Sequence, residues 1–380
     1  MELQTFNYTQ EKGWSVNAFP ALDSPQTLVI LFGAKEYVDN QKPIAKLIKA
    51  FPQSIFVGCS TAGEILGSVI QDATISVAVM KFKQTILKSF STEIKSMDDS
   101  FSTGTQLAEH LNKDNLRGIF ILSEGLNINA SQLIKGLNAA LPNHVVVTGG
   151  LAGDGDRFKQ TWVISDKQLK SNYVTAVGFY GDKIRIGHGS RGGWDSFGPE
   201  RVITNSKDNV LYELDHKPAL ALYKEYLGEE GTKQLPASGL LFPLAIRENT
   251  EDKREIVRTI LGVDEKTQSM IFAGDVPTGY LAKLMRANFE NLIEGANIAA
   301  LDSKKNQTES PILAVAISCV GRRLLLKEYT EEETEATLQS FPLGTQQIGF
   351  YSYGEISPYT TGHCDLHNQT MTMTTFSEEQ

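Results

Sequence analysis

The feature that most constrains the fold is a short turn, a glycine followed by an acidic residue, which occurs three times in the 380-residue chain. The three copies, each at the end of an apolar run, are residues 55–65 (IFVGCSTAGEI), 148–154 (TGGLAGD) and 348–356 (IGFYSYGEI). Asp154 follows Glu64 by 90 residues, and Glu355 follows Glu64 by 291. Internal repeats indicate duplication of a structural unit, so we expect a duplicated fold with a site where the turns meet.

The repeated unit is longer than the turn. Residues 28–32 and 118–122 are apolar runs with the same spacing of 90, and each precedes a helical pattern, a second run, the turn and a third run. The complete units are residues 28–80, 118–179 and 312–376. A unit of roughly 90 residues exceeds the roughly 20–50 residues of a solenoid repeat. We therefore predict an α/β fold with two domains built from duplicated strand-helix-strand-turn-strand units and mixed sheets.

The domain boundary is predicted from composition. Residues 187–199 are rich in glycine, which indicates a loop rather than a strand or a helix. We expect a first domain at 1–205 with two tandem units, and a second at 206–380 with one unit behind a helical or extended lead-in. The periodicity of apolar residues predicts helices at residues 103–112, 215–227 and 288–301.

Charge and composition exclude several classes of protein. The net charge of −9 and the pI of about 5.3 argue against binding to nucleic acid or to an anionic membrane. No apolar run approaches the roughly 18 residues of a membrane span, and the first ten residues do not resemble a signal peptide. Three scattered cysteines are too few for a disulfide framework. We expect a soluble cytoplasmic protein.

The Gly-acid turns are the first candidate site. Glycine lets backbone amides face a ligand, and the acidic side chains could bind an ammonium group or cap the element that follows. The glycines could equally do no more than permit corners between strands. The predicted ligand-binding residues, in a concave surface, are Ser60, Thr61, Glu64, Asp154, Tyr353 and Glu355.

Histidines are the second candidate site. His363 and His367 stand four residues apart, and His188 lies in the glycine-rich segment. One of these three could be the axial ligand of a haem iron, with Cys364 as a softer alternative. A hydrogen-bonded loop histidine explains the pair equally well. For His188 the alternative is a solvent-facing residue of a flexible loop between the domains.

The sequence contains no diagnostic set of catalytic residues. No local Ser-His-Asp, Ser-Lys or Cys-His signature is present, and no zinc-protease motif occurs. We therefore expect that the chain is not an enzyme. Arg322 and Arg323 follow an apolar run and are predicted to be a solvated strand end rather than an anion-binding pair.

Six motifs in order resemble the FIST sensory proteins, which carry an N-terminal and a C-terminal FIST domain. The motifs are residues 58–64 (GCSTAGE), 149–154 (GGLAGD), 213–220 (ELDHKPAL), 318–323 (SCVGRR), 351–355 (YSYGE) and 366–371 (LHNQTM). One departure is His216, where the family pattern has a small residue, usually glycine.

The resemblance implies an intracellular sensor of a small-molecule ligand. A subset of free-standing FIST proteins bind haem b, sense nitric oxide and regulate a histidine kinase, so we expect output through a separate signalling partner of that kind. A sensor of an amino-acid-like metabolite is the alternative, and an enzyme is a weaker one. Family membership alone does not choose the ligand.

Overall fold

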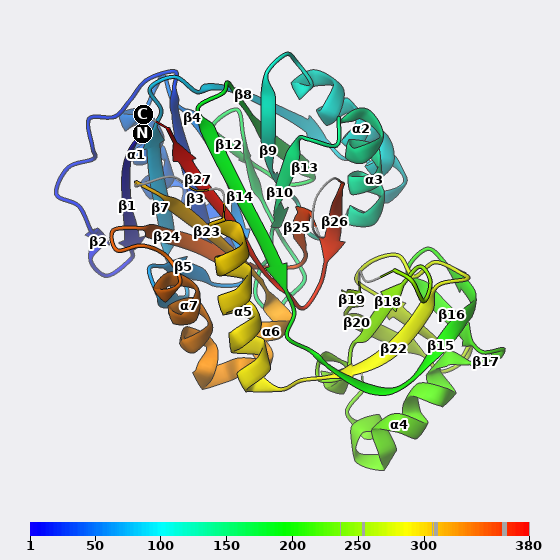
Figure 1. The fold of residues 1–380 in the computed structure, drawn as a ribbon. Helices are drawn as coiled ribbons and strands as arrows, with labels where there is room; N and C mark the ends of the chain where they lie inside the picture. The colour runs from blue at the N-terminus through cyan, green and yellow to red at the C-terminus, as the bar shows by residue number, and fades with distance from the viewer. Residues whose placement is uncertain (236, 253–254, 306, 308–310, 359–362, 380) are drawn as a thin grey trace.

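The computed structural model describes residues 1–235, 237–252, 255–305, 307, 311–358 and 363–379 (Figure 1). Three sheets with helices around them form one body, and a fourth sheet with its own helix lies beside it. Each of the three sheets contains one parallel pair of strands, and its other described pairs are antiparallel. The predicted mixed α/β class is therefore confirmed.

The first repeated unit forms the centre of the first sheet. Its elements are β1 (Glu2–Thr9), β2 (Gly13–Trp14), β3 (Thr27–Ala34), η1 (Lys35–Val38), α1 (Lys42–Ala50), β4 (Ile55–Thr61) and β7 (Ile75–Lys81). Strand β3 pairs in parallel with β4 and antiparallel with β7, β7 pairs with β1, and β2 lies beyond β1 at the edge. Every residue of β3 is buried, as expected for an apolar strand covered on both faces.

The second unit repeats this order. Its elements are β8 (Ile86–Glu93), η2 (Met97–Asp99), α2 (Ser100–Leu111), β9 (Leu116–Ser123), α3 (Ala130–Ala140), β10 (Val146–Leu151) and β13 (Tyr173–Tyr180). Strand β9 pairs in parallel with β10 and antiparallel with β13, and β8 lies at the edge. The helix predicted at 103–112 is α2, which begins three residues earlier, at Ser100.

The third unit has the same core but is interrupted. Its elements are β14 (Ile184–Arg191), α5 (Phe289–Ser303), β23 (Leu313–Cys319), α6 (Val320–Leu326), η4 (Lys327–Tyr329), α7 (Thr330–Gln339), β24 (Gln346–Ser352) and β27 (Met371–Glu378). Strand β23 pairs in parallel with β24 and antiparallel with β27, and β14 lies at the edge. The repeated unit predicted from the sequence thus occurs three times in the fold.

The strands that follow each turn leave their own unit. Hairpin β5–β6 (Glu64–Leu66, Val69–Gln71) of the first unit pairs with β24 of the third. Hairpin β11–β12 (Val163–Ser165, Gln168–Lys170) of the second unit pairs with β4 of the first. Hairpin β25–β26 (Glu355–Pro358, Cys364–His367) of the third unit pairs with β10 of the second. The three units therefore exchange hairpins in a ring.

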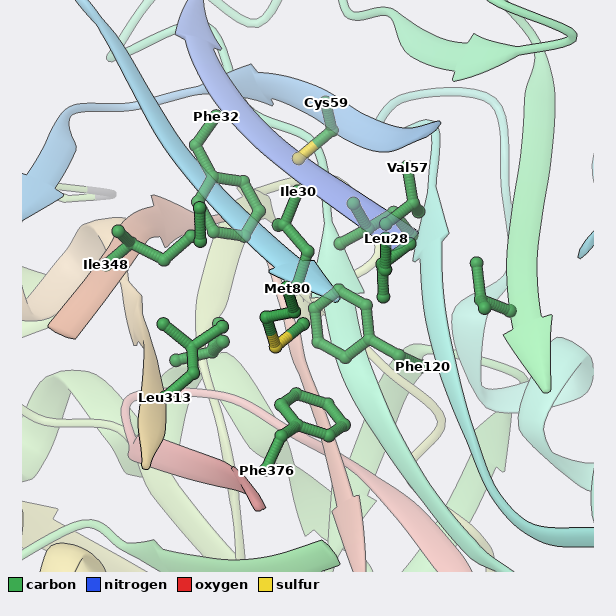
Figure 2. Packing of buried hydrophobic residues seen from close by; sticks show 14 of the residues in the cluster. Leu28, Ile30, Phe32, Val57, Cys59, Met80, Phe120, Leu313, Ile348 and Phe376 are labelled. Carbon is green, nitrogen blue, oxygen red and sulfur yellow. The ribbon is translucent and has the colours of Figure 1, made fainter. Parts of the chain in front are cut away.

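A shared core joins the three sheets (Figure 2). It contains side chains from all three units, among them Leu28, Ile30, Phe32, Val57, Met80, Phe120, Leu313, Ile348 and Phe376. The rings of Phe32 and Phe350 have centroids 4.6 Å apart, and those of Phe120 and Phe376 lie 6.0 Å apart. Because this core draws on every unit, none of the three units contains it alone.

An inserted sheet separates β14 from the rest of the third unit. Its elements are β15 (Asp195–Lys207), β16 (Val210–Leu214), β17 (Lys217–Pro218), α4 (Ala219–Lys233), η3 (Ala237–Leu240), β18 (Leu244–Arg247), β19 (Ile256–Arg258), β20 (Ile260–Asp264), β21 (Ser269–Phe272) and β22 (Leu281–Arg286). It has its own apolar core, which includes Leu220, Tyr223 and Phe272. The predicted division into 1–205 and 206–380 falls inside β15 and stays a prediction.

The loop predicted at residues 187–199 is wrong, since most of the segment lies in β14 and β15. Glycine occurs there because helix α5 packs directly on the strand. A Cβ at Gly187 would overlap the carbonyl oxygen of Ser303, and one at Gly189 would overlap that of Ala299. The glycines therefore serve close contact between strand and helix rather than a flexible connection.

The two later helices begin after their predicted starts. Helix α4 starts at Ala219 rather than 215, because Asp215 and His216 have φ angles of 51° and 61° in the turn before β17. The left-handed backbone at His216 also explains why the family pattern places glycine there. Helix α5 begins at Phe289, capped by the side chain of Asn288. No helix in the described part of the chain is long and apolar enough to cross a bilayer.

Candidate functional site

The three Gly-acid turns meet, as the repeat predicted. The backbone N–H of Gly153 donates to the carbonyl of Ser60 at 2.9 Å, which joins the second turn to the first. The N–H of Ala62 donates to Tyr351 at 2.8 Å, and the N–H of Tyr353 donates to Leu151 at 3.4 Å. These bonds link the first turn to the third and the third to the second. The turns therefore form a closed ring.

The acidic residues of the first and third turns are buried in equivalent networks. Thr74 donates to the Glu64 carboxylate from its backbone N–H at 2.9 Å and its hydroxyl at 2.8 Å, and Thr61 also donates to it. The Glu355 carboxylate accepts from the Ser352 hydroxyl at 2.7 Å and the Thr370 hydroxyl at 3.0 Å. Each carboxylate thus ties its turn to the start of the unit's third strand.

Burial perturbs both of these carboxyl groups. It raises the pKa of Glu64 to about 7, although hydrogen bonds from Thr61 and Thr74 oppose the shift. It raises the pKa of Glu355 to about 8 against hydrogen bonds from Ser352 and Thr370. Desolvation disfavours the charged form of a carboxyl group, so the charged form of each is the costly one.

Asp154 of the second turn has a different environment. Its carboxylate accepts from the backbone N–H groups of Phe158, Lys159 and Gln160, each at 2.9 Å, and from the Tyr353 hydroxyl. Burial disfavours the charge, but these donors hold the pKa of Asp154 below its usual value. Asp154 therefore stabilises the loop at 155–160 as a carboxylate.

A cleft of about 890 Å³ opens beside the first turn. Its floor is the turn itself, residues 61–64, and one wall is residues 155–157 after the second turn. The rest of the lining includes residues of α6, η4 and the start of α7 in the third unit. All three units therefore contribute residues to the cleft.

Arg323 of α6 is the most constrained charge in the cleft. Its Nη1 donates to the carbonyl of Ala62 at 2.6 Å and to Asp72 Oδ1 at 2.7 Å, and its Nη2 donates to Asp72 Oδ2 at 2.8 Å. Gly63 lies directly beneath, with a φ of 131°, and a Cβ there would overlap the guanidinium. The hydrogen bonds and charge of Arg323 lower the pKa of Asp72.

Two more basic side chains line the cleft. Arg157 Nε donates to the carbonyl of Asp154 at 2.7 Å, and its Nη1 donates to Glu36 Oε1 at 2.8 Å. Lys327 makes no ion pair within the described residues, and its backbone has a φ of 50° at the end of α6. A positive φ is unfavourable for a lysine, so the fold tolerates strain where it presents this ammonium group.

The predicted ligand-binding residues divide into two groups. Thr61 and Glu64 line the cleft, and Asp154 immediately precedes the wall at 155–157. The Ser60 hydroxyl is buried and accepts a hydrogen bond from the backbone N–H of Trp162 at 3.1 Å. Tyr353 is hydrogen-bonded to Asp154, and Glu355 is hydrogen-bonded to Thr370. Neither Tyr353 nor Glu355 borders the cleft. A ligand role for the six residues stays a prediction.

The expectation of a solvated basic pair at 322–323 is wrong. Arg322 is fully buried with Glu333 of α7, and its Nε lies 2.6 Å from Glu333 Oε2. Tyr351 and Ser318 donate hydroxyl hydrogen bonds to the same carboxylate at 3.1 and 2.8 Å. The sequence did not predict the basic cleft residues Arg157, Arg323 and Lys327, although Arg323 belongs to one of the recognised motifs.

The candidate haem ligands lie apart from the cleft. His363 is exposed, and His188 is half-buried on β14, where burial lowers its pKa. His367 is buried on β26 with Nε2 2.9 Å from the carbonyl of Ser357, and burial lowers its pKa. The pocket beside His367 measures about 160 Å³, below the roughly 300–1,000 Å³ of ligand pockets.

The surroundings of His367 do not fit a haem. The small pocket at His367 is lined by charged side chains, Arg191 and Glu255, whereas a haem needs a large and mostly apolar pocket. Within the described residues, no group of three or more His, Cys, Asp or Glu side chains could hold a metal ion. Haem binding by one of the three histidines stays a prediction.

Comparison with known families agrees with the architecture. The FIST N domain model matches residues 27–217, and the FIST C domain model matches residues 219–358. The chain belongs to the FIST family. Both halves of the FIST pattern share the hairpin ring, because β5–β6 of the N-terminal part pairs with β24 of the C-terminal part.

This FIST protein is also similar to an uncharacterized protein of Methanocaldococcus jannaschii. The two are 23% identical over 356 residues, which cover 80% of this chain and 64% of the relative. The chain therefore spans less than two thirds of the length of that relative.

Proposed function

We propose that this FIST protein is a small-ligand sensor that binds an amino-acid-like metabolite in the cleft at the first turn. The observation that carries the proposal is the presence of charges of both signs around one cleft of about 890 Å³. A cleft of this size is typical of small-molecule sites. Its lining comes from three units, so a ligand bound there can contact more than one of them.

The lining suits a ligand with an ammonium group and a carboxylate. Arg157, Arg323 and Lys327 can bind the carboxylate. Six acidic residues, Glu36, Glu64, Asp72, Asp156, Glu328 and Glu331, outnumber these three bases. The excess of acid favours a ligand that also carries a positive charge. Apolar side chains, including Ile70, Val320 and Leu324, can contact the rest of the ligand.

The first test is a screen for stabilisation by ligands. The twenty standard amino acids and related amines are added to the protein, and the unfolding temperature is measured. A ligand at 100 times its Kd adds about 2.7 kcal/mol, so a binding compound raises the unfolding temperature clearly. No shift with any compound would contradict the proposed ligand class.

A variant then places the binding in the cleft. Lys327→Gln removes a charge that has no ion pair within the described residues, so it should weaken binding of the hit by about tenfold without unfolding the protein. Lys95→Gln makes the same change at an exposed position outside the cleft and should leave affinity unchanged. Equal affinities of both variants would move the site elsewhere.

We also propose that the signal passes to a separate partner, with a histidine kinase as the first candidate. A ligand can shift an equilibrium between two states only by its differential affinity for them. Kinase autophosphorylation should therefore change when the protein is added, and change again with the ligand. Identical rates with and without ligand would exclude that partner.

The haem b and nitric-oxide version of the sensor has its own test. Haemin added to the protein should give a Soret absorption band if a histidine ligates the iron. Single alanine substitutions of His188, His363 and His367 should then identify the ligand by loss of that band. The expectation that the protein is not an enzyme stays a prediction.

A further inference from the structure

We infer that Arg323 binds the carboxylate of the ligand, and that Asp72 occupies this position until the ligand displaces it. The inference rests on the proposed function and names the recognition group of the same cleft. Asp72 is in effect an internal competitor, a carboxylate of the protein that mimics the carboxylate of the ligand.

Arg323 is positioned independently of Asp72. The carbonyl of Ala62 accepts from its Nη1 at 2.6 Å, the Tyr351 ring lies 5.6 Å from the guanidinium carbon, and Gly63 leaves room beneath. The neighbouring Arg322 is held by the buried pair with Glu333, which anchors α6. Removing Asp72 would therefore leave the guanidinium in place and aimed into the cleft.

Asp72, in contrast, is held weakly. It lies in the turn between β6 and β7, and its side chain is 72% exposed, whereas that of Arg323 is 25% exposed. An ion pair with one solvent-exposed partner contributes little net stability, because water competes for the exposed charge. The partner that can leave at little cost is thus the carboxylate.

The geometry of the pair is the geometry that a free carboxylate would adopt. The two Arg323 nitrogens donate to the two Asp72 oxygens at 2.7 and 2.8 Å, the two-pronged arrangement that arginine favours with carboxylates. Arg157 is also pinned by a turn carbonyl, but it makes only one bond to Glu36, at 2.8 Å. Arg323 is therefore the stronger candidate anchor.

Displacement of Asp72 would couple binding to the ring of turns. The Arg323–Asp72 pair joins α6 of the third unit to the turn after hairpin β5–β6 of the first unit. A ligand carboxylate on Arg323 would break the ion pair between Arg323 and Asp72. The hydrogen bond from Arg323 to the carbonyl of Ala62 would remain.

The test compares the twenty standard amino acids as free acids with their carboxamides, on wild type, Asp72→Asn and Arg323→Lys. In wild type the free acids should bind more tightly than the amides. Asp72→Asn removes the competitor and should tighten binding of the free acids by about fivefold. Arg323→Lys keeps the charge but loses the planar fork, so acids should lose about tenfold while amides stay unchanged.

Asp182→Asn is the matched control, because Asp182 is an exposed partner of Arg117 outside the cleft, with 76% of its side chain exposed. It should not alter binding. Unfolding temperatures of every variant verify the fold, and Asp72→Asn decides the matter even if Arg323→Lys fails to fold. Acids and amides that bind alike, or weaker acid binding in Asp72→Asn, overturn the inference alone. No binding by any variant overturns the proposed function as well.

Discussion

At the scale of single residues, a buried glutamate has the same role in the first turn and in the third. Glu64 and Glu355 each accept hydrogen bonds from a hydroxyl three residues earlier and from a threonine that precedes the unit's last strand. The duplication therefore preserved a polar tie, and not merely an apolar pattern. A buried polar network of this kind is stabilising only while its members remain bonded.

Burial of the Glu64 carboxyl group predicts a stability that falls as the pH rises. The folded pKa of Glu64, about 7, lies above its ordinary value of 4.5. Between those values the folded state holds a proton that the unfolded state has lost, so the stabilisation is complete below the lower value and disappears through the upper one. Glutamine does not ionise. In Glu64→Gln the free energy of unfolding that is lost as the pH rises should therefore be smaller by about 3 kcal/mol.

Urea unfolding of wild type and variant between pH 4.5 and 8 measures the effect. Glu93→Gln, at an exposed position in β8, is the control and should follow wild type. An unchanged pH dependence in Glu64→Gln would show that the carboxyl group ionises in the fold as readily as in the unfolded chain.

At the scale of elements, glycine decides how closely a helix can approach a strand. Helix α5 packs on β14, and the two glycines of that strand face carbonyl oxygens of the helix. Side chains at these positions would push the helix away from the sheet. The glycines that indicated a loop at residues 187–199 are thus required for the packing of α5 on β14.

Gly189→Ala should therefore destabilise the protein by about 1–3 kcal/mol, since its Cβ would overlap the carbonyl oxygen of Ala299. Gly262→Ala in β20 is the control, because its Cβ would lie 3.8 Å from the nearest side-chain atom, Ile271 Cδ1. Chemical unfolding gives both free energies. Equal losses would refute the close-packing explanation.

At the scale of the whole molecule, the inserted sheet is held against the second unit by a small polar contact. Asp275 accepts from Gln132 Nε2 at 2.9 Å, Lys135 Nζ at 2.9 Å and Asn129 Nδ2 at 3.3 Å, which belong to the N-cap and the first two turns of α3. Arg258 donates to the carbonyl of Leu366 on β26 at 2.9 Å. The chain enters and leaves the inserted sheet close together, after β14 and before α5 (Figure 1).

Asp275→Ala should loosen this contact without unfolding either part. Hydrogen exchange in the first turn of α3 and in β19 should accelerate by about tenfold or more, while exchange in β3 stays unchanged. Glu265→Ala, which breaks an ion pair with Lys224 inside the inserted part, is the control. Uniform acceleration across the molecule would mean that Asp275 supports global stability instead.

The sequence by itself determined the triple duplication, the mixed α/β class and the family. Apolar runs, helical periods and the glycine of each turn are local signals, so they survive in any arrangement of the units. Thr61 and Glu64 could be placed at a cleft because they belong to one of those turns.

Only the tertiary structure decided which unit each hairpin joins, and therefore which turn borders a cleft. Local patterns carry no information about partners that are distant in sequence, as with β5 beside β24. The same limit explains why the sequence could not distinguish the surroundings of Arg322 and Arg323, which are adjacent in the chain. One is buried against Glu333 and the other faces Asp72, because one turn of α6 points its side chains in different directions.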